Sequence, residues 1–236
     1  MCFFKKNPKP IGEQFNYSGY HKVFSENFTT PIDWNKWTWE YPGGQDQKEK
    51  TKWVQECTVQ DSNGLHLIAK KGDGVNLCGQ LCSFKFLETL YGYITFTAKM
   101  PPNGLLYFPA LWGYNKMGWQ PEIDIVELAG GQSNELWFTY HWDNNGSDVA
   151  VGTHLKWEKT NFDQGFHEYA VEWTPSYITW YVDKMPYYKI SENIPTVPIF
   201  WIMGIQAGYG PPFTHLFTDS ESGKSVDIKL FEIWQK

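Results

Sequence analysis

The clearest structural signal in the sequence is the stretch Tyr91-Gly92-Tyr93-Ile94-Thr95-Phe96-Thr97-Ala98-Lys99-Met100. Successive side chains of a strand point to opposite faces, so Ile94, Phe96 and Ala98 would share one face while the threonines share the other. A period of two over this length predicts a β-strand.

Similar stretches recur along the chain and are separated by turn signals. The strand-like stretches are residues 65–69, 178–182 and 226–230, and the turns include 63–64, 72–74 and 145–146. No segment of a dozen residues keeps a helical stripe free of Gly and Pro. Many short strands with frequent turns are typical of a sandwich or jelly roll. We therefore predict an all-β fold, a β-jelly-roll sandwich of two antiparallel sheets.

A chain of 236 residues fits one domain of this class. Residues 1–20 are polar, contain Pro8 and Pro10, and are predicted to form an N-terminal lead-in. Residues 21–236 show no linker, repeat or low-complexity tract and are predicted to form a single domain.

The composition favours a ligand with apolar faces. Aromatic residues make up 18% of the chain, including 13 Trp, which is more than a core usually needs. Flat rings with a polar edge suit ligands such as sugars, although a β protein can also be rich in strand-favouring aromatics. The net charge of −6 and the absence of basic runs longer than two residues argue against nucleic acid. No stretch approaches the roughly 18 apolar residues of a membrane span, and we expect a monomer.

The four cysteines, Cys2, Cys57, Cys78 and Cys82, are too few to staple a chain of this size. Cys78 and Cys82 could pair, and so could Cys57 with either, or all could be buried thiols. No histidine accompanies them at the spacing of zinc ligands. The first residues lack the order of a signal peptide, in which charge precedes a long apolar run.

The candidate chemistry lies in Trp119-Gln120-Pro121-Glu122-Ile123-Asp124-Ile125-Val126-Glu127-Leu128. On a regular strand Glu122 and Asp124 share a face and Glu127 falls on the opposite one. One extra residue in a β-bulge would return Glu127 to the face of the other two acids. Ile123 and one residue of 125–126 would then face the core.

Three acids on one face repel each other when ionised, which a purely structural strand does not require. Two carboxyls about 5 Å apart suit a retaining glycosidase, in which one attacks the anomeric carbon and the other donates a proton. A neighbouring anion raises a carboxyl's pKa and keeps one group protonated near neutral pH. Asp124 can hydrogen-bond the nucleophile. A solvated acidic strand or a calcium site is the alternative, but calcium usually takes its ligands from loops.

The sequence here resembles glycoside hydrolase family 16, whose signature is Glu-x-Asp-x-(x)-Glu. Residues 122–127 match its longer, bulged form. Further segments agree in order, and these are residues 91–101, 108–112, 166–173 and 178–183. The segment 108–112 resembles the family's Trp-Pro-Ala-x-Trp, with Phe108 for the first Trp. The resemblance extends from about residue 23 to residue 234, nearly the whole chain.

The resemblance implies that Glu122 is the nucleophile, Asp124 the helper and Glu127 the acid/base, with no cofactor needed for catalysis. It also implies a substrate cleft lined with aromatic residues across a concave sheet. Trp112 and Trp119 are candidate platforms because they closely precede the catalytic strand. His141 matches a family position, and Trp137 shares its strand face by alternation. For the tryptophans the alternative is core packing, and for His141 it is a structural role.

The expected function is retaining, endo-acting hydrolysis of a polysaccharide, with β-1,3- or mixed-linkage β-1,3-1,4-glucan first. Endo-β-galactan hydrolysis, on agar, carrageenan or mucin-type glycans, is the closest alternative. Residues 52–59 lack the Asn-Glu-x-Gln-x-Tyr of many β-1,3-glucanases, and residues 201–208 have Gly and Gln where Asn is common. A transglycosylase and a non-catalytic sugar-binding jelly roll complete the alternatives. We expect a secreted or cell-surface protein, with Cys2 a candidate for lipid attachment.

The resemblance also implies a structural calcium ion on the convex side. Asp227 matches the family's aspartate, while Asn27 and Gly64 match its carbonyl donors. Calcium favours such oxygen ligands and tolerates irregular geometry. The alternative is that Asp227 is a solvated residue.

Overall fold

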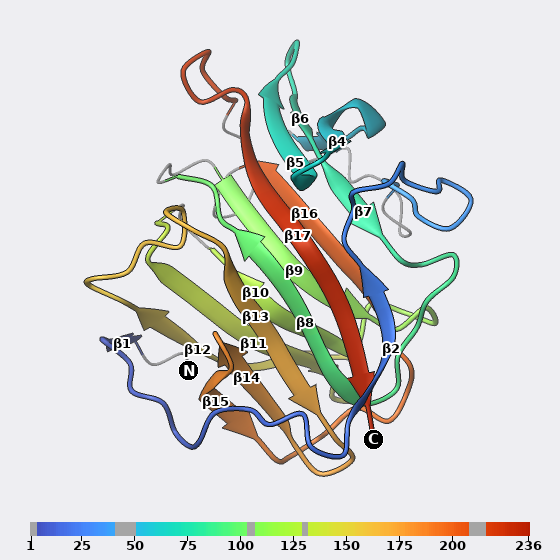
Figure 1. Cartoon of the computed structure of the whole chain (residues 1–236), viewed down its shortest axis with the longest axis vertical. Coiled ribbons are helices and arrows are strands. Elements are labelled where there is room, and N and C mark those ends of the chain that lie inside the picture. The colour runs from blue at the N-terminus through green and yellow to red at the C-terminus, as the bar shows by residue number, and fades with distance from the viewer. Residues whose placement is uncertain (1–3, 41–50, 103–106, 129–131, 208–215) are drawn as a thin grey trace.

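The alternating stretch at residues 91–100 forms strand β8 (Gly92–Lys99), an inner strand of the larger of two sheets. The computed structural model describes residues 4–40, 51–102, 107–128, 132–207 and 216–236. These residues form two sheets that pack face to face (Figure 1). Their only helical element is the 3-10 turn η1 (Gln55–Cys57). No helix in this part of the chain is long and apolar enough to cross a membrane.

The smaller sheet has seven strands within the described residues. In spatial order they are β1 (Phe4–Lys6), β12 (Asp148–Lys156), β11 (Glu135–Asp143), β10 (Glu122–Glu127), β9 (Tyr107–Tyr114), β16 (Phe200–Ala207) and β7 (Gln80–Cys82).

The larger sheet has ten strands by the same count. Its main path is β15 (Met185–Ile190), β14 (Ile178–Val182), β13 (His167–Trp173), β8, β17 (Lys224–Gln235), β5 (Gly64–Lys71), β6 (Asn76–Cys78) and β3 (Thr51–Trp53). Two further strands, β2 (His21–Glu26) and β4 (Thr58–Asp61), pair with β17 and β5.

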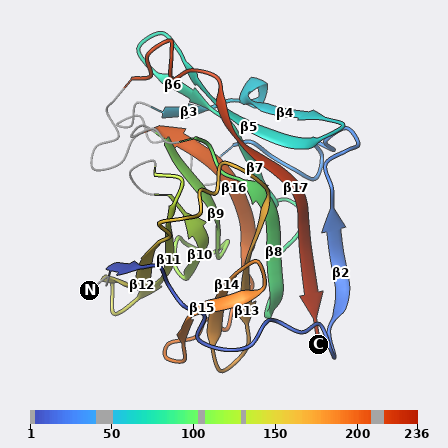
Figure 2. The same ribbon diagram turned by 60° about the vertical axis from the view of Figure 1, so that its left-hand side comes forward.

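The core lies between the two sheets, which Figure 2 shows from the side. Ile94, Phe96 and Ala98 of β8 are completely buried there, as the alternation requires, and meet Ile123 and Ile125 from β10. Most strand pairs are antiparallel, and two edge pairs, β1 with β12 and β3 with β6, are parallel. The predicted all-β sandwich of two sheets is confirmed.

The predicted lead-in packs against the fold. After β1, the chain passes along the lower edge of the molecule in Figure 1 before it enters β2. The amide of Phe15 donates to the carbonyl of Lys184, and the Phe15 ring stacks on Tyr93 of β8 with 3.6 Å between ring centroids. The outer face of β8 is therefore covered at Tyr93 by the chain's own N-terminal segment.

The cysteines within the described residues are buried. Cys57 and Cys82 are thiols, so none of the three disulfides that we considered among Cys57, Cys78 and Cys82 is formed. Burial raises the pKa of Cys57 to about 11 and that of Cys82 to about 12. Both groups are therefore neutral and poorly reactive at physiological pH. Cys2 lies outside the described residues.

Candidate active site

Strand β10 carries the three acids and contains the predicted bulge. The pairing between β10 and β11 shifts between Asp124 and Glu127, and the pairing with β9 shifts in the same interval. Ile123 and the two residues at 125–126 are fully buried against the core. The extra residue therefore brings Glu127 to the same outer face as Glu122 and Asp124.

Three rows of paired residues cross this sheet, one through each acid. From β12 to β16, the rows are Ala150, His141, Glu122, Tyr114 and Phe200; Gly152, Thr139, Asp124, Trp112 and Ile202; and His154, Trp137, Glu127, Ala110 and Gly204. Three of the four predicted sugar-binding residues, Trp112, Trp137 and His141, thus lie beside the acids on one face.

The aromatic side chains of these rows surround the acids. Trp112 stacks beside Tyr114 with 5.4 Å between ring centroids, and Trp137 stacks on His154 at 4.2 Å. Trp119 is the fourth predicted platform and lies just before β10, with 49% of its surface exposed. Flat rings of this kind can bind the apolar faces of sugars. The predicted cleft itself stays a prediction.

Two effects act in opposite directions on the pKa of Glu122. Burial raises the pKa of Glu122, and the indole N–H of Trp119 opposes this shift by donating a hydrogen bond to Oε2. The hydrogen bond favours the ionised form because the indole can only donate. Glu122 is therefore buried but has a donor ready for its negative charge.

The other two acids retain protons more readily than free carboxyls. Burial first, and then the nearby charges of Glu127 and Glu122, raise the pKa of Asp124 well above its usual range. Burial raises the pKa of Glu127 to about 7, against a hydrogen bond with Thr139 that lowers it. The three carboxyls therefore carry fewer than three charges near neutral pH. One can act as a nucleophile while another donates a proton.

His141 adjoins two of the acids. Its Nε2 lies 3.6 Å from Oδ2 of Asp124 and 3.9 Å from Oε1 of Glu122, while Nδ1 lies 3.2 Å from Oδ1 of Asp148. Neither Asp148 nor Thr139 is among the site residues predicted from the sequence. The turn signal at residues 145–146 could have placed Asp148 beside His141, because a tight hairpin fixes which residues face each other.

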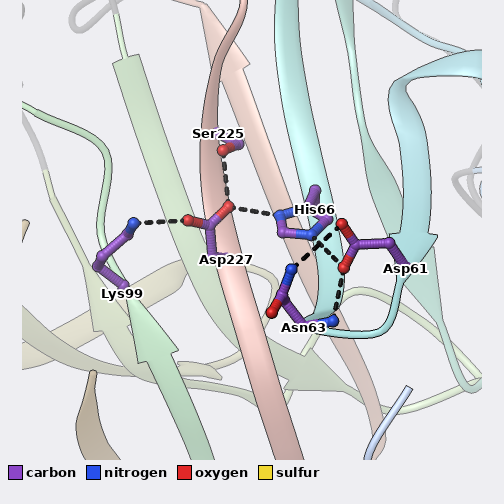
Figure 3. A network of polar contacts seen from close by, with 6 residues as sticks. All are labelled: Asp61, Asn63, His66, Lys99, Ser225 and Asp227. Carbon is purple, nitrogen blue, oxygen red and sulfur yellow. Dashed lines mark hydrogen bonds and ion pairs between the residues drawn. The ribbon is translucent and has the colours of Figure 1, made fainter. Parts of the chain in front are cut away.

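The residues predicted to hold calcium do not fit the ion. Figure 3 shows Asp227 of β17 between Lys99 and His66. The Lys99 ammonium lies 2.9 Å from Oδ2, and His66 Nδ1 lies 2.8 Å from Oδ1. Calcium needs oxygen ligands, and an ammonium at this distance takes one carboxylate oxygen and repels a second cation.

The side-chain features at the two other predicted positions, Asn27 and Gly64, are explained without an ion. Oδ1 of Asn27 accepts hydrogen bonds from the amide and hydroxyl of Thr29. Gly64 has a φ of +124°, and a Cβ there would lie 2.4 Å from the carbonyl oxygen of Ile228. Close backbone packing therefore explains this glycine. Asp227, the one side-chain ligand of the predicted calcium site, does not fit the ion, because a lysine and a histidine already neutralise it.

Comparison with known proteins gives a consistent family. The family described as glycosyl hydrolases family 16 matches residues 44–215. The chain is 35% identical over 106 residues to the endo-1,3-1,4-beta-glycanase ExsH of Rhizobium meliloti, a match that covers 44% of this chain and 22% of that protein. It is 28% identical over 210 residues to the glucan endo-1,3-beta-glucosidase A1 of Niallia circulans, covering 75% and 30% respectively. The chain therefore spans less than a third of the length of either relative.

A solved structure has the same fold. It is the catalytic domain of an endo-1,3-beta-glucanase (laminarinase) from Thermotoga petrophila, with a TM-score of 0.77 and 24% identity. The match covers 92% of this chain and 98% of that one. The similarity confirms the predicted jelly-roll class.

Proposed function

The chain belongs to the glycosyl hydrolases of family 16, and we propose that it is a retaining endo-hydrolase of β-1,3- or mixed-linkage β-1,3-1,4-glucan. The observation that carries this proposal is the bulge in β10, which brings Glu122, Asp124 and Glu127 to one face. The names of the two curated relatives, a 1,3-1,4-β-glycanase and a 1,3-β-glucosidase, support β-glucan as the substrate class.

In the first step Glu122 attacks the anomeric carbon from one side of the sugar. The bond from this carbon to the leaving oxygen breaks as Glu127 transfers its proton to that oxygen, and a glycosyl ester forms on Glu122. Trp119 stabilises Glu122 as the attacking anion through its N–H, while protonated Asp124 adds a second hydrogen bond.

In the second step Glu127, now ionised, takes a proton from water. The oxygen of this water attacks the same carbon, the ester bond breaks, and Glu122 is released as a carboxylate. Two inversions at one carbon leave the product in the β configuration. The raised pKa of Glu127 suits both roles, because the group must give and take a proton near neutral pH.

The proposal is tested by sizing the products from laminarin, mixed-linkage β-glucan, agarose, carrageenan and mucin O-glycans. We expect a series of oligosaccharides from one of the two glucans, with the β anomer first in proton NMR spectra. The matched control is Glu122→Gln, which keeps the shape of the side chain but removes its charge. This variant should bind the polymer and lose turnover by at least about 10³-fold.

Other outcomes of this experiment would contradict the proposed function. Cleavage of agarose, carrageenan or mucin glycans alone would make the protein an endo-β-galactan hydrolase. Products longer than the substrate would indicate a transglycosylase. Binding without cleavage would indicate a sugar-binding protein, and an α anomer formed first would exclude the retaining mechanism.

A further inference from the structure

Asp148 lies next to the acid cluster but outside the strand that carries it. It is the first residue of β12, and its partner across the hairpin is Asp143 of β11. His141 precedes Asp143 by two residues, so the side chains of His141, Asp143 and Asp148 share the outer face of the sheet. Asp148 is therefore the diagonal neighbour of His141, which itself pairs with Glu122 of β10.

The imidazole of His141 spans the gap between Asp148 and the acids. Nδ1 lies 3.2 and 3.3 Å from the two carboxylate oxygens of Asp148, while Nε2 points toward Asp124 and Glu122. The side-chain amide of Gln120 donates a further hydrogen bond to Oδ1 of Asp148. Asp148 is thus held from one side by Gln120 and from the other by His141.

The carboxylate of Asp148 decides which nitrogen carries the proton of a neutral ring. A carboxylate can only accept, so Nδ1 must carry a hydrogen, and the lone pair of a neutral ring then lies on Nε2. Buried Oδ2 of Asp124, which has no hydrogen-bond partner within the described residues, is the nearest acid oxygen to this nitrogen. The one proton of a protonated Asp124 can lie toward Glu122 or toward Nε2, and an ionised Asp124 can accept from Nε2 when that nitrogen carries a hydrogen.

The hairpin itself does not need Asp148. Oδ1 of Asp143 accepts a hydrogen bond of 2.7 Å from the amide of Gly146. The backbones of Asn144 and Ser147 bond to each other in both directions. The turn is therefore closed by other residues, and the side chain of Asp148 contacts His141 and Gln120 instead.

We propose that Asp148 is a positioning residue that fixes the orientation and tautomer of His141, so that Nε2 shares protons with Asp124 and Glu122. This inference rests on the proposed function, because it assigns Asp148 a part in the same reaction. The charge of Asp148 also raises the pKa of Glu122 and of Asp124, after burial and the closer groups have acted.

The test compares Asp148→Asn with Asp148→Glu. An asparagine amide can donate to Nδ1 and favours the wrong tautomer, so we expect kcat to fall about ten- to a hundredfold with little change in KM. The pH profile of kcat should also move to lower pH, because the negative charge near Glu122 and Asp124 is lost. Asp148→Glu restores the acceptor and should recover the profile and part of the rate.

Two controls separate positioning from a general effect on the fold. Asp183→Asn removes another aspartate that bonds to a histidine, His167, at 2.8 Å on the larger sheet, and should leave kcat and the profile unchanged. In a His141→Gln background, Asp148→Asn should lower kcat no further, because the two residues act as one unit.

Nitrogen-15 NMR of the histidine ring decides the inference without any substrate. We expect a signal from Nδ1–H of His141 in the native protein and from Nε2–H in Asp148→Asn, with the signal assigned from its loss in His141→Gln. Failure of the native protein to cleave any glycan would overturn the proposed function and leave this measurement to decide the tautomer. Unchanged kcat, pH profile and ring signal in Asp148→Asn of an active enzyme would overturn the inference.

Discussion

At the scale of single residues, the indole of Trp119 controls the charge of Glu122 from outside the sheet. Its N–H lowers a pKa that burial would otherwise raise further. In Trp119→Phe the ring is kept and the donor is lost. We expect the acidic limb of the pH profile to move to higher pH by about one unit, since a hydrogen bond to a charged group contributes about 1.5–3 kcal/mol and water partly replaces it.

The matched control for Trp119 is Trp234→Phe. Trp234 also donates its indole N–H to a glutamate, Glu232, but on the larger sheet. This variant should keep the native profile. An acidic limb that stays in place in Trp119→Phe would show that the indole has no influence on the charge of Glu122.

Single residues also show what the sequence could predict. Glu122, Asp124 and Glu127 could be assigned to one face from their spacing. Glu127 follows Asp124 by an odd number of residues, so a regular strand would place it on the opposite face, and a bulge of one extra residue returns it to the face of the other two acids. The contact of Trp119 with Glu122 could not be predicted, because it depends on the path of a loop. The contact of Asp148 with His141 depends on a hairpin register, which the turn signal at residues 145–146 could have supplied.

At the scale of elements, Asp227 ties three strands together. It lies opposite His66 on β5 and opposite Lys99 on β8, so an anion on the middle strand is flanked by basic groups on both sides. Opposite charges directly across a sheet stabilise the pair. The sequence could not show these partners of Asp227, because Lys99 and His66 are distant in sequence and only the fold brings them to it.

The network predicts a stability that depends on pH and is independent of metal. Burial lowers the pKa of His66, but its hydrogen bonds with Asp227 and Asp61 outweigh burial and raise it overall. The charged ring therefore stabilises the fold fully below about pH 6.5, and this part is lost as the pH rises through the raised pKa. Asp227→Asn should lower the free energy of unfolding by about 1–3 kcal/mol, and by more at pH 5.5 than at pH 8.5.

Urea unfolding at the two pH values measures this effect, and a chelator should leave the native midpoint unchanged. Asp219→Asn is the control, because Asp219 pairs with Lys71 at 3.0 Å but is 92% exposed, and it should change stability little. A midpoint lowered by the chelator in the native protein and not in Asp227→Asn would restore the calcium site.

At the scale of the whole molecule, the outer faces of the two sheets have different functions. The outer face of the seven-stranded sheet presents the acids and the rings around them, whereas part of the outer face of the ten-stranded sheet, at Tyr93, Ala170 and Tyr181, is covered by the chain's N-terminal segment. Residues 1–20 were predicted to form a lead-in because they are polar and contain Pro8 and Pro10. Its packing depends on a few aromatic residues, which a pattern search over strands does not detect.

Phe15 is the centre of this packing and gives the last prediction. Its ring stacks on Tyr93 at an angle of 9° and meets Tyr17, Tyr20 and Tyr181 by their edges. Phe15→Ala should lower the free energy of unfolding by about 2–3 kcal/mol, somewhat less than for a fully buried ring. The kcat on glucan should stay the same because the acids lie on the other sheet. Phe15→Leu, which keeps apolar volume, should lose about half as much stability in urea unfolding. A Phe15→Ala variant that unfolds like the native protein but hydrolyses glucan more slowly would contradict this prediction. The N-terminal segment would then influence the catalytic seven-stranded sheet and would not stabilise the ten-stranded sheet on which it packs.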